Sequence, residues 1–291
     1  MSDVAAWATA ESDGDATTGR PDTRAGTSHR TRTLRSFLTG RVFVLLLQIL
    51  ICVGFLLIWE YGGLVDELYV SRPSAIFRAI QRWQSEGSLV PNLIVTAQTT
   101  AFGFVLGGAL GLVVGFALGV NDFLGKVFRP FVTALNSVPR LALVPLFIIW
   151  FGLGMSSKVA LVTTVVFFLI FYNTYAGVRD VDRQIVDVVR LMKARRRHIY
   201  LKVILPSAMT WIIAGMRVSV PYALVAAVTA EMLASNRGMG YLLQRSAGQF
   251  YMPGVFAAII VMVVLAMVLM AFVSVVERRL MAWKPPSSFQ S

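Results

Sequence analysis

The sequence is poor in charged residues, and above all in acidic ones. Only 14% of its 291 residues are charged, with 15 acidic against 27 basic side chains. In contrast, 56% of the residues are apolar and the mean hydropathy is +0.69. A soluble chain of this composition would have too little polar surface to cover itself. The composition therefore indicates a membrane protein that crosses the bilayer several times.

Cysteine and histidine are almost absent. Cys52 is the only cysteine, which excludes an intrachain disulfide. His29 and His198 are far apart in the sequence, so no Cys/His cluster predicts a metal site. The segment Gly119–Val127 resembles a phosphate-binding loop, but five residues separate its glycines and no hydroxyl residue follows the lysine. We expect no catalytic residue and no metal site, so any ATP hydrolysis must belong to another chain.

Positive charge is in excess, with a formal net charge of +12. Such a balance can indicate nucleic-acid binding. Here, however, the basic residues lie at the ends of apolar segments rather than on one soluble face, as is typical of the cytoplasmic loops of membrane proteins. We therefore expect no nucleic-acid partner.

Six apolar segments are long enough to cross a bilayer. They predict an all-α membrane protein with spans at Val42–Tyr61, Leu93–Val120, Phe131–Phe151, Val159–Val178, Ala208–Leu233 and Val255–Val276. With an even number of spans, 19 Lys and Arg residues lie on the side of the termini and six on the other. This asymmetry places both termini in the cytoplasm.

The two ends of the chain differ from the span region. Residues 1–36 lack a continuous apolar run and predict a disordered cytoplasmic tail. A cleaved signal peptide is not expected, because the first long apolar stretch begins only at Val42. Residues 37–284 form the predicted six-helix domain, which contains a cytoplasmic loop at 179–206, and residues 285–291 form a cytoplasmic C-terminal tail.

Glycine and proline have a distinct pattern in the spans. The second span has a glycine at every fourth residue, which creates one smooth helix face. Small residues allow helices to approach closely in lipid, and we favour internal packing of this face over a homodimer contact. Pro139, Pro145 and Pro221 predict breaks or bends in the third and fifth spans.

Polar side chains inside predicted spans are candidates for a solute path. They are Asn136, Arg140, Asn173, Arg217 and Glu231. One interpretation places Arg140 or Arg217 against an anionic solute. The other, which we favour for both arginines, has them neutralise carbonyl groups or reach the membrane interface.

The loop Asp180–Pro206 is too long and too regularly patterned for a simple connection. Ile185, Val188, Val189 and Met192 recur at helical spacing, which predicts one apolar face. Arginines and lysines surround this face and suit acidic partner residues or lipid phosphates. We expect the face to bind a partner protein, although an amphipathic helix that rests on lipid would have the same pattern.

The spacing within this loop resembles the EAA loop of the membrane subunits of bacterial ABC importers. Counted from Asp187, Lys193 is six residues on, Val203 is sixteen, and Leu205 and Pro206 are eighteen and nineteen. The resemblance extends through most of the chain after Val42 and is greatest to the nitrate/sulfonate/taurine branch. The other residues that carry it are Ser71–Ser74, the glycine pattern, Val138–Leu146, Trp150–Gly152, Asn173, Ala214–Arg217, Ala230–Met232 and Gly238–Tyr241.

This resemblance implies a type I (MetI-like) permease in the cell inner membrane. The loop would form a short helix held in a groove of an ATPase subunit, through Ile185, Asp187, Val188, Val189, Met192, Lys193, Leu205 and Pro206. Two ATPase copies would bind the ATP and magnesium, so this chain needs no cofactor of its own. A second permease chain, by default another copy of this one, would complete the solute path across the lipid bilayer.

The family also implies a periplasmic or lipid-anchored solute-binding protein. Its expected docking surfaces are Leu68–Gly87 and Ala234–Pro253. The expected solute is small, polar and anionic, namely a sulfonate, nitrate or an organic carboxylate. Near relatives carry thiamine-precursor and flavin-type solutes, and these remain open.

Several positions depart from the EAA pattern. Asp187 stands for the glutamate, Val188 and Val189 for the two alanines, and Lys193 for the glycine. Because lysine adopts a positive φ less readily than glycine, we expect the turn to be built differently here. One hypothesis is that this chain is the divergent half of a heterodimer.

Two other classes of protein share some of these features. A self-contained secondary transporter or channel would be expected to show inverted repeats and acidic residues at mid-membrane, and neither is evident. A membrane scaffold would bind a cytoplasmic partner without transport.

Overall fold

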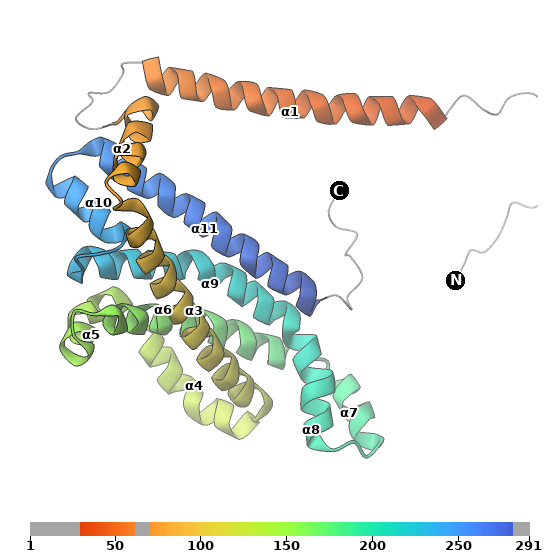
Figure 1. The fold of residues 1–291 in the computed structure, drawn as a ribbon. Coiled ribbons are helices and arrows are strands. Elements are labelled where there is room, and N and C mark those ends of the chain that lie inside the picture. Colours follow the sequence, from red (N-terminus) through yellow and green to blue (C-terminus); the bar gives the residue numbers. More distant parts are fainter. Residues whose placement is uncertain (1–29, 62–69, 282–291) are drawn as a thin grey trace, which may run out of the picture. The chain divides into compact units, whose positions relative to one another are not determined.

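The computed structural model describes residues 30–61 and 70–281. The described residues form helices and short connections without a strand (Figure 1). In chain order the elements are α1 (Arg30–Tyr61), α2 (Pro73–Ser85), α3 (Leu89–Val120), α4 (Asp122–Asn136), the 3₁₀ helix η1 (Arg140–Leu143), α5 (Val144–Phe151), α6 (Met155–Arg179), α7 (Arg183–Leu191), α8 (Arg196–Ile199), the π-helix η2 (Tyr200–Ile204), α9 (Leu205–Ala234), α10 (Met239–Gly248) and α11 (Met252–Leu280).

The chain divides into two compact units, residues 1–58 and 59–291. The first unit contains most of α1, whose segment Phe43–Tyr61 is apolar and long enough to cross a membrane. This helix begins at Arg30, so the predicted tail of residues 1–36 is in part helical. Residues 1–29 of that tail and the predicted tail 285–291 lie outside the described residues.

Five helical segments of the described chain are long and apolar enough to be spans. They are Phe43–Tyr61, Leu89–Val120, Met155–Arg179, Arg196–Ala234 and Met252–Arg279, and they match five of the six predicted segments. The predicted third span, Phe131–Phe151, is broken at Pro139, as predicted. The chain forms α4 and then η1–α5, bent by 79°, and α4 begins at Asp122 in a stretch that we expected to be a loop.

Proline explains the break but not every predicted bend. Pro139 has no N–H group and disfavours the helical conformation at Val138, so α4 ends before it. Pro145 lies in the first turn of α5, where a missing N–H costs nothing. Pro221 lies within α9 without interrupting it, and Pro130, for which no bend was predicted, lies inside α4.

The glycine face of α3 packs on α6, which confirms the prediction of internal packing. The two helices run parallel, because Gly103 lies against Val162 and Gly119 against Val178. The glycines between them face the backbone of α6 at equal spacing, namely Gly107, Gly111 and Gly115. Close backbone approach of this kind is a main source of helix association in lipid.

The remaining helices of the second unit complete the bundle around α6. Helix α9 runs antiparallel to α6, with Trp211 against Gly177 and Gly215 against Asn173. Helices α2 and α10 pack with α11 at the end where α3 begins (Figure 1). We call this the α10 end of the bundle, and we call the opposite end, which contains α7 and α8, the α7 end.

The glycine contact leads to a test by alanine substitution. In Gly111→Ala the added Cβ would lie 2.6 Å from the Phe167 carbonyl oxygen and 3.0 Å from the Phe171 nitrogen. Because backbone atoms cannot move aside locally, we expect a loss of about 1–3 kcal/mol and a lower melting temperature in detergent. In the control Gly108→Ala the nearest atom is Ile170 Cδ1 at 3.2 Å, the end of a flexible side chain. Equal losses in the two variants would contradict this account.

Candidate functional site

The predicted partner-binding loop forms two short helices at the α7 end. Asp182 caps α7, and its Oδ1 accepts a hydrogen bond from the Gln184 N–H at 2.8 Å. After α7 the chain reverses direction and continues through α8 and η2 into α9 without a break. Leu205 and Pro206, which end the sequence motif, form the first turn of α9.

The apolar residues of α7 lie on two different faces. Val186 and Val189 pack against a buried cluster formed by Val178, Ile199, Ile204, Ala208 and Ile212. The exposed face carries four large apolar side chains, Ile185 (52% exposed), Val188 (57%), Leu191 (83%) and Met192 (77%). Thus Val189, which we placed on the partner face, is half-buried and packs toward the protein. Leu191 was not among the residues predicted for this face, although its spacing of three residues from Val188 is the signal that could have identified it.

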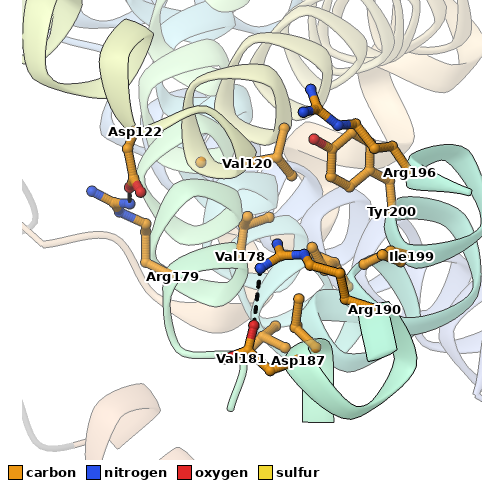
Figure 2. A pocket seen from close by; sticks show the side chains of 13 residues that line it. Val120, Asp122, Val178, Arg179, Val181, Asp187, Arg190, Arg196, Ile199 and Tyr200 are labelled. Atoms are coloured by element: carbon orange, nitrogen blue, oxygen red, sulfur yellow. Dashed lines mark hydrogen bonds and ion pairs between the residues drawn. The ribbon is translucent and has the colours of Figure 1, made fainter. Parts of the chain in front are cut away.

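A cleft of about 440 Å³ lies behind α7, between this helix and the ends of α3 and α6 (Figure 2). Its lining includes the apolar side chains of Val120, Val178 and Ile199. Two ion pairs lie at the cleft, Arg179 with Asp122 and Arg190 with Asp187, the latter at 2.9 Å. Asp187, at the glutamate position of the motif, therefore neutralises its neighbour Arg190.

The turn after α7 has the hydrogen bonds of a Schellman motif. The Lys193 N–H donates to the Arg190 carbonyl at 3.0 Å, and the Ala194 N–H donates to the Val189 carbonyl at 3.4 Å. Lys193 has a φ of 57°, the left-handed conformation that this motif requires and that glycine adopts most readily. The expectation of a differently built turn was wrong. Lysine occupies the glycine position and adopts its conformation, at a cost of about 1–2 kcal/mol.

We predict that Lys193→Gly keeps this turn and that Lys193→Pro disrupts it. Proline fixes φ near −65° and removes the N–H that bonds to Arg190. Loss of the bond and the turn should exceed about 1.4 kcal/mol, so the α7 amides should exchange hydrogen roughly tenfold faster. Hydrogen-exchange mass spectrometry of the purified protein measures this rate, with α3 amides as the internal reference. Equal exchange in the glycine and proline variants would contradict the assignment.

Arg217, a candidate for the solute path, forms an ion pair with Glu277 of α11. The Arg217 side chain is 51% exposed, whereas that of Glu277 is only 20% exposed. Neither sequence interpretation anticipated this pair, because Glu277 lies 60 residues further on. Within the described residues, Arg217 thus has its charge compensated by α11.

The pair predicts a specific pattern of stabilities. Arg217→Gln should lower the stability by roughly 1–3 kcal/mol, because the mostly buried Glu277 carboxylate loses its partner. Adding Glu277→Gln should restore most of the loss, since both charges are then absent. Melting temperatures of the two single variants and the double variant in detergent measure the coupling. Strictly additive losses would show that the pair does not contribute.

Glu231, another path candidate, is fully buried near the α10 end. Its Oε2 accepts hydrogen bonds from Thr96 Oγ1 at 2.8 Å and from the Gly240 N–H at 2.9 Å. Thr96 Oγ1 in turn accepts from the Met239 N–H at 2.8 Å, and Asn92 Oδ1 accepts from the Gly238 N–H at 2.6 Å. These bonds join the start of α10 to α3 and α9. Glu231 therefore holds the α9–α10 connection in place.

Of the other three candidates for the solute path, Asn173 packs between helices, whereas Asn136 and Arg140 lie at the break in the third span. Asn173 donates from Nδ2 to the Leu169 carbonyl at 2.8 Å and packs against Gly215 of α9. Asn136 and Arg140 lie together on the two sides of the α4–η1 break, where Arg140 Nη2 donates to Asn136 Oδ1. The Arg140 guanidinium also lies over the Phe168 ring, 4.9 Å from its centroid. The structure thus brings together only this pair of the five candidates.

Comparison with known proteins gives the family. The model of the binding-protein-dependent transport system inner membrane component matches residues 107–282, more than half of the chain. The chain belongs to this family of permeases.

The permease is similar to transport proteins of several bacteria. It is 35% identical to the putative aliphatic sulfonates transport permease protein SsuC of Bacillus subtilis (strain 168), over 78% of this chain and 83% of that protein. It is 30% identical to the formylaminopyrimidine transport permease protein ThiX of Halalkalibacterium halodurans, over 79% and 92%. An inward-facing structure of the MetNI methionine ABC transporter has the same fold, with a TM-score of 0.60 and 17% identity, over 68% of this chain and 98% of that one.

The predicted class is therefore confirmed. The permease is a multi-pass membrane component of an ABC importer with a MetI-like fold. It is not the enzyme of that system, because ATP is hydrolysed by a separate ATPase subunit. Membership of the family also implies a solute-binding protein as a partner.

Proposed function

We propose that this permease forms the membrane path for ATP-driven import of a small organic anion, most closely a sulfonate. The observation that supports ATP-driven import is the exposed apolar face of α7, which we propose binds an ATPase. It is formed by Ile185, Val188, Leu191 and Met192. The sulfonate assignment is supported by the name of the SsuC relative. The ThiX relative makes a formylaminopyrimidine the alternative solute.

The α7 face is suited to an ATPase groove. Burial of a large apolar side chain contributes about 1.5–3 kcal/mol, so four together supply a substantial part of a stable interface. Exposed arginines follow the helix at Arg195, Arg196 and Arg197 and suit acidic groups of a partner. Lipid alone is a poorer partner for this face. The other face of α7 already packs against the protein through Val186 and Val189, and Leu191 and Met192 lie at the C-terminal end of the helix. We propose two ATPase copies, which bind the ATP and magnesium.

The same proposal assigns the orientation of the protein. The α7 end faces the cytoplasm of a cell with an inner membrane, and both termini lie on that side. Basic residues support this, since the α7–α8 loop is rich in arginine and such loops are retained in the cytoplasm. The α10 end then faces outward and receives the solute-binding protein on 68–87 and 234–253. Helices α2 and α10 lie in these segments and pack into one cluster with α11.

A second permease chain completes the path, and we propose a second copy of this one. The heterodimer hypothesis was based on the divergent motif. Its strongest element was Lys193 in place of glycine, yet Lys193 adopts the left-handed conformation of the turn. The remaining changes keep the charge at position 187 and leave Val188 on the exposed face.

Mass spectrometry of a mild-detergent pull-down from native membranes tests the complex. We expect an ATPase, a solute-binding protein and no second type of permease chain. The recovered binding protein is then titrated with taurine, butanesulfonate and formylaminopyrimidine by calorimetry. Recovery of this chain alone, in a preparation where other complexes survive, would contradict the proposal.

Substitutions on α7 test the docking face directly. Val188→Asp with Leu191→Asp should reduce ATPase recovery more than tenfold, because each charge loses over about 1.4 kcal/mol on burial in an interface. The melting temperature of the permease should stay unchanged, since both side chains are exposed. The control Gln184→Asp adds a charge at an exposed polar position of the same helix. Unchanged ATPase recovery in the double variant would overturn the assignment of α7.

A further inference from the structure

Arg140 carries a charge at the middle of a membrane span. Its guanidinium lies over Phe168, and Phe168 is near the centre of the 25-residue helix α6. At 1.5 Å per residue, the Phe168 backbone is about 20 Å from the start of α6 and about 17 Å from its end. A lipid headgroup therefore cannot reach this charge without entering the hydrocarbon region.

No acidic side chain neutralises Arg140 within the described part of the chain. The acidic residues there have other partners or lie in connections outside the spans. They are Glu60 with Ser74, Glu86 in the α2–α3 turn, Asp122 with Arg179, Asp180 with Trp211, Asp182 with Gln184, Asp187 with Arg190, Glu231 with Thr96 and Glu277 with Arg217. An uncompensated charge at this depth is expensive and marks a functional site by default.

The hydrogen bonds of Arg140 are also incomplete. Nη2 donates to the side-chain oxygen of Asn136 and, at 3.5 Å, to its carbonyl. Nε is buried without a hydrogen-bond partner, and the hydrogen bonds of Arg140 to described residues all come from Nη2. An arginine has five N–H groups in a planar fork that matches the oxygens of carboxylates, sulfonates and phosphates. The free donors are therefore suited to an oxyanion.

The break that precedes Arg140 indicates that this side of the span does not face lipid. Residues Ser137, Val138 and Pro139 are not helical and are exposed in this chain. Non-helical backbone at membrane depth is tolerated only where protein buries it or where it lines a water-filled cavity. This surface therefore faces the second permease chain or the solute path, and not lipid.

We propose that the Arg140 guanidinium binds the anionic group of the solute at mid-membrane, through the N–H groups of its terminal nitrogen Nη1. This inference rests on the proposed function and names its specificity-determining residue. Asn136 Oδ1 accepts a hydrogen bond from the guanidinium, and the guanidinium makes a cation–π contact with the Phe168 ring. The cation–π contact keeps the charge in place without cancelling it, so the attraction for an anion persists.

The rival explanation is that Arg140 only stabilises the break, through its bonds to Asn136. A structural role predicts lower stability on substitution, but it does not predict a positive potential that water-soluble anions experience. The test must therefore measure charge at the site in a way that does not depend on transport.

Cysteine labelling provides this test. In a Cys52→Ser background, Ser137→Cys places a thiol three residues from Arg140 on the exposed break. Methanethiosulfonate reagents react with the thiolate and hence only where water reaches it. We compare the rates of the anionic ethylsulfonate reagent and the cationic trimethylammonium reagent in membranes. Their ratio cancels any effect of Arg140 on the pKa of the thiol.

With Arg140 present, the anionic reagent should react faster than the cationic one. The rate ratio should fall roughly tenfold or more in Arg140→Gln and change little in Arg140→Lys, because the reagents differ by two charges near the site. Excess butanesulfonate should slow the anionic reagent only when position 140 is charged. Val264→Cys, an exposed apolar position midway along α11, is the control and should react with neither reagent.

Three results would overturn the proposal. They are the absence of labelling at position 137, a rate ratio that does not depend on the charge at position 140, and the absence of protection by butanesulfonate. ATPase recovery from the same variants separates this proposal from the broader one. Loss of the ATPase with a retained rate ratio counts against the proposed docking, whereas a lost ratio with the ATPase retained counts against Arg140.

Discussion

The backbone contact between α3 and α6 is the constraint on which the rest of this structure depends. In lipid, helices gain little from hydrophobic burial, so small residues that allow close approach decide which helices pair. The five glycines of α3 meet one side of α6, and Trp211 and Gly215 of α9 meet another. Helices α3 and α9 occupy two sides of α6, and Phe168 of α6 contacts Arg140 of the broken span. The position of Arg140 thus follows from the packing of helices that do not contain it.

The charged side chains inside the bundle make hydrogen bonds or ion pairs that join two segments of the fold, and Arg140 is the exception. Arg217 has Glu277, Lys158 donates to Ser235 at 2.6 Å, and Glu231 is held by Thr96 and Gly240. Each of these contacts joins two segments of the fold, so a structural role accounts for its presence. Arg140 instead bonds to a residue only four positions away and keeps donors free. Stability alone does not account for it, since an apolar residue would cost less at this depth.

Sequence patterns predicted the class, five of the spans and the helix in the loop 180–206, because hydropathy and spacing are local properties. They failed where contacts are distant in sequence. The ion pair of Arg217 with Glu277 and the hydrogen bonds of Glu231 with Thr96 and Gly240 join segments that no local sequence pattern relates. The broken third span was foreseen at Pro139 but not its start at Asp122, since α4 is amphipathic and not uniformly apolar. The inward position of Val189 depends on α8 and α9, which pack behind it.

A continuous series of helix contacts connects α7 with Arg140. Helix α8 continues through the π-helix η2 into α9, so a force on the α7–α8 loop acts on the start of α9. Helix α9 contacts α6 where side chains meet glycine, at Gly177 and Gly215, and closely packed surfaces transmit displacement rather than absorb it. Helix α6 carries Phe168, which supports the Arg140 guanidinium. If the proposed ATPase moves α7, this series of contacts would move Phe168 and with it the proposed anion site at Arg140.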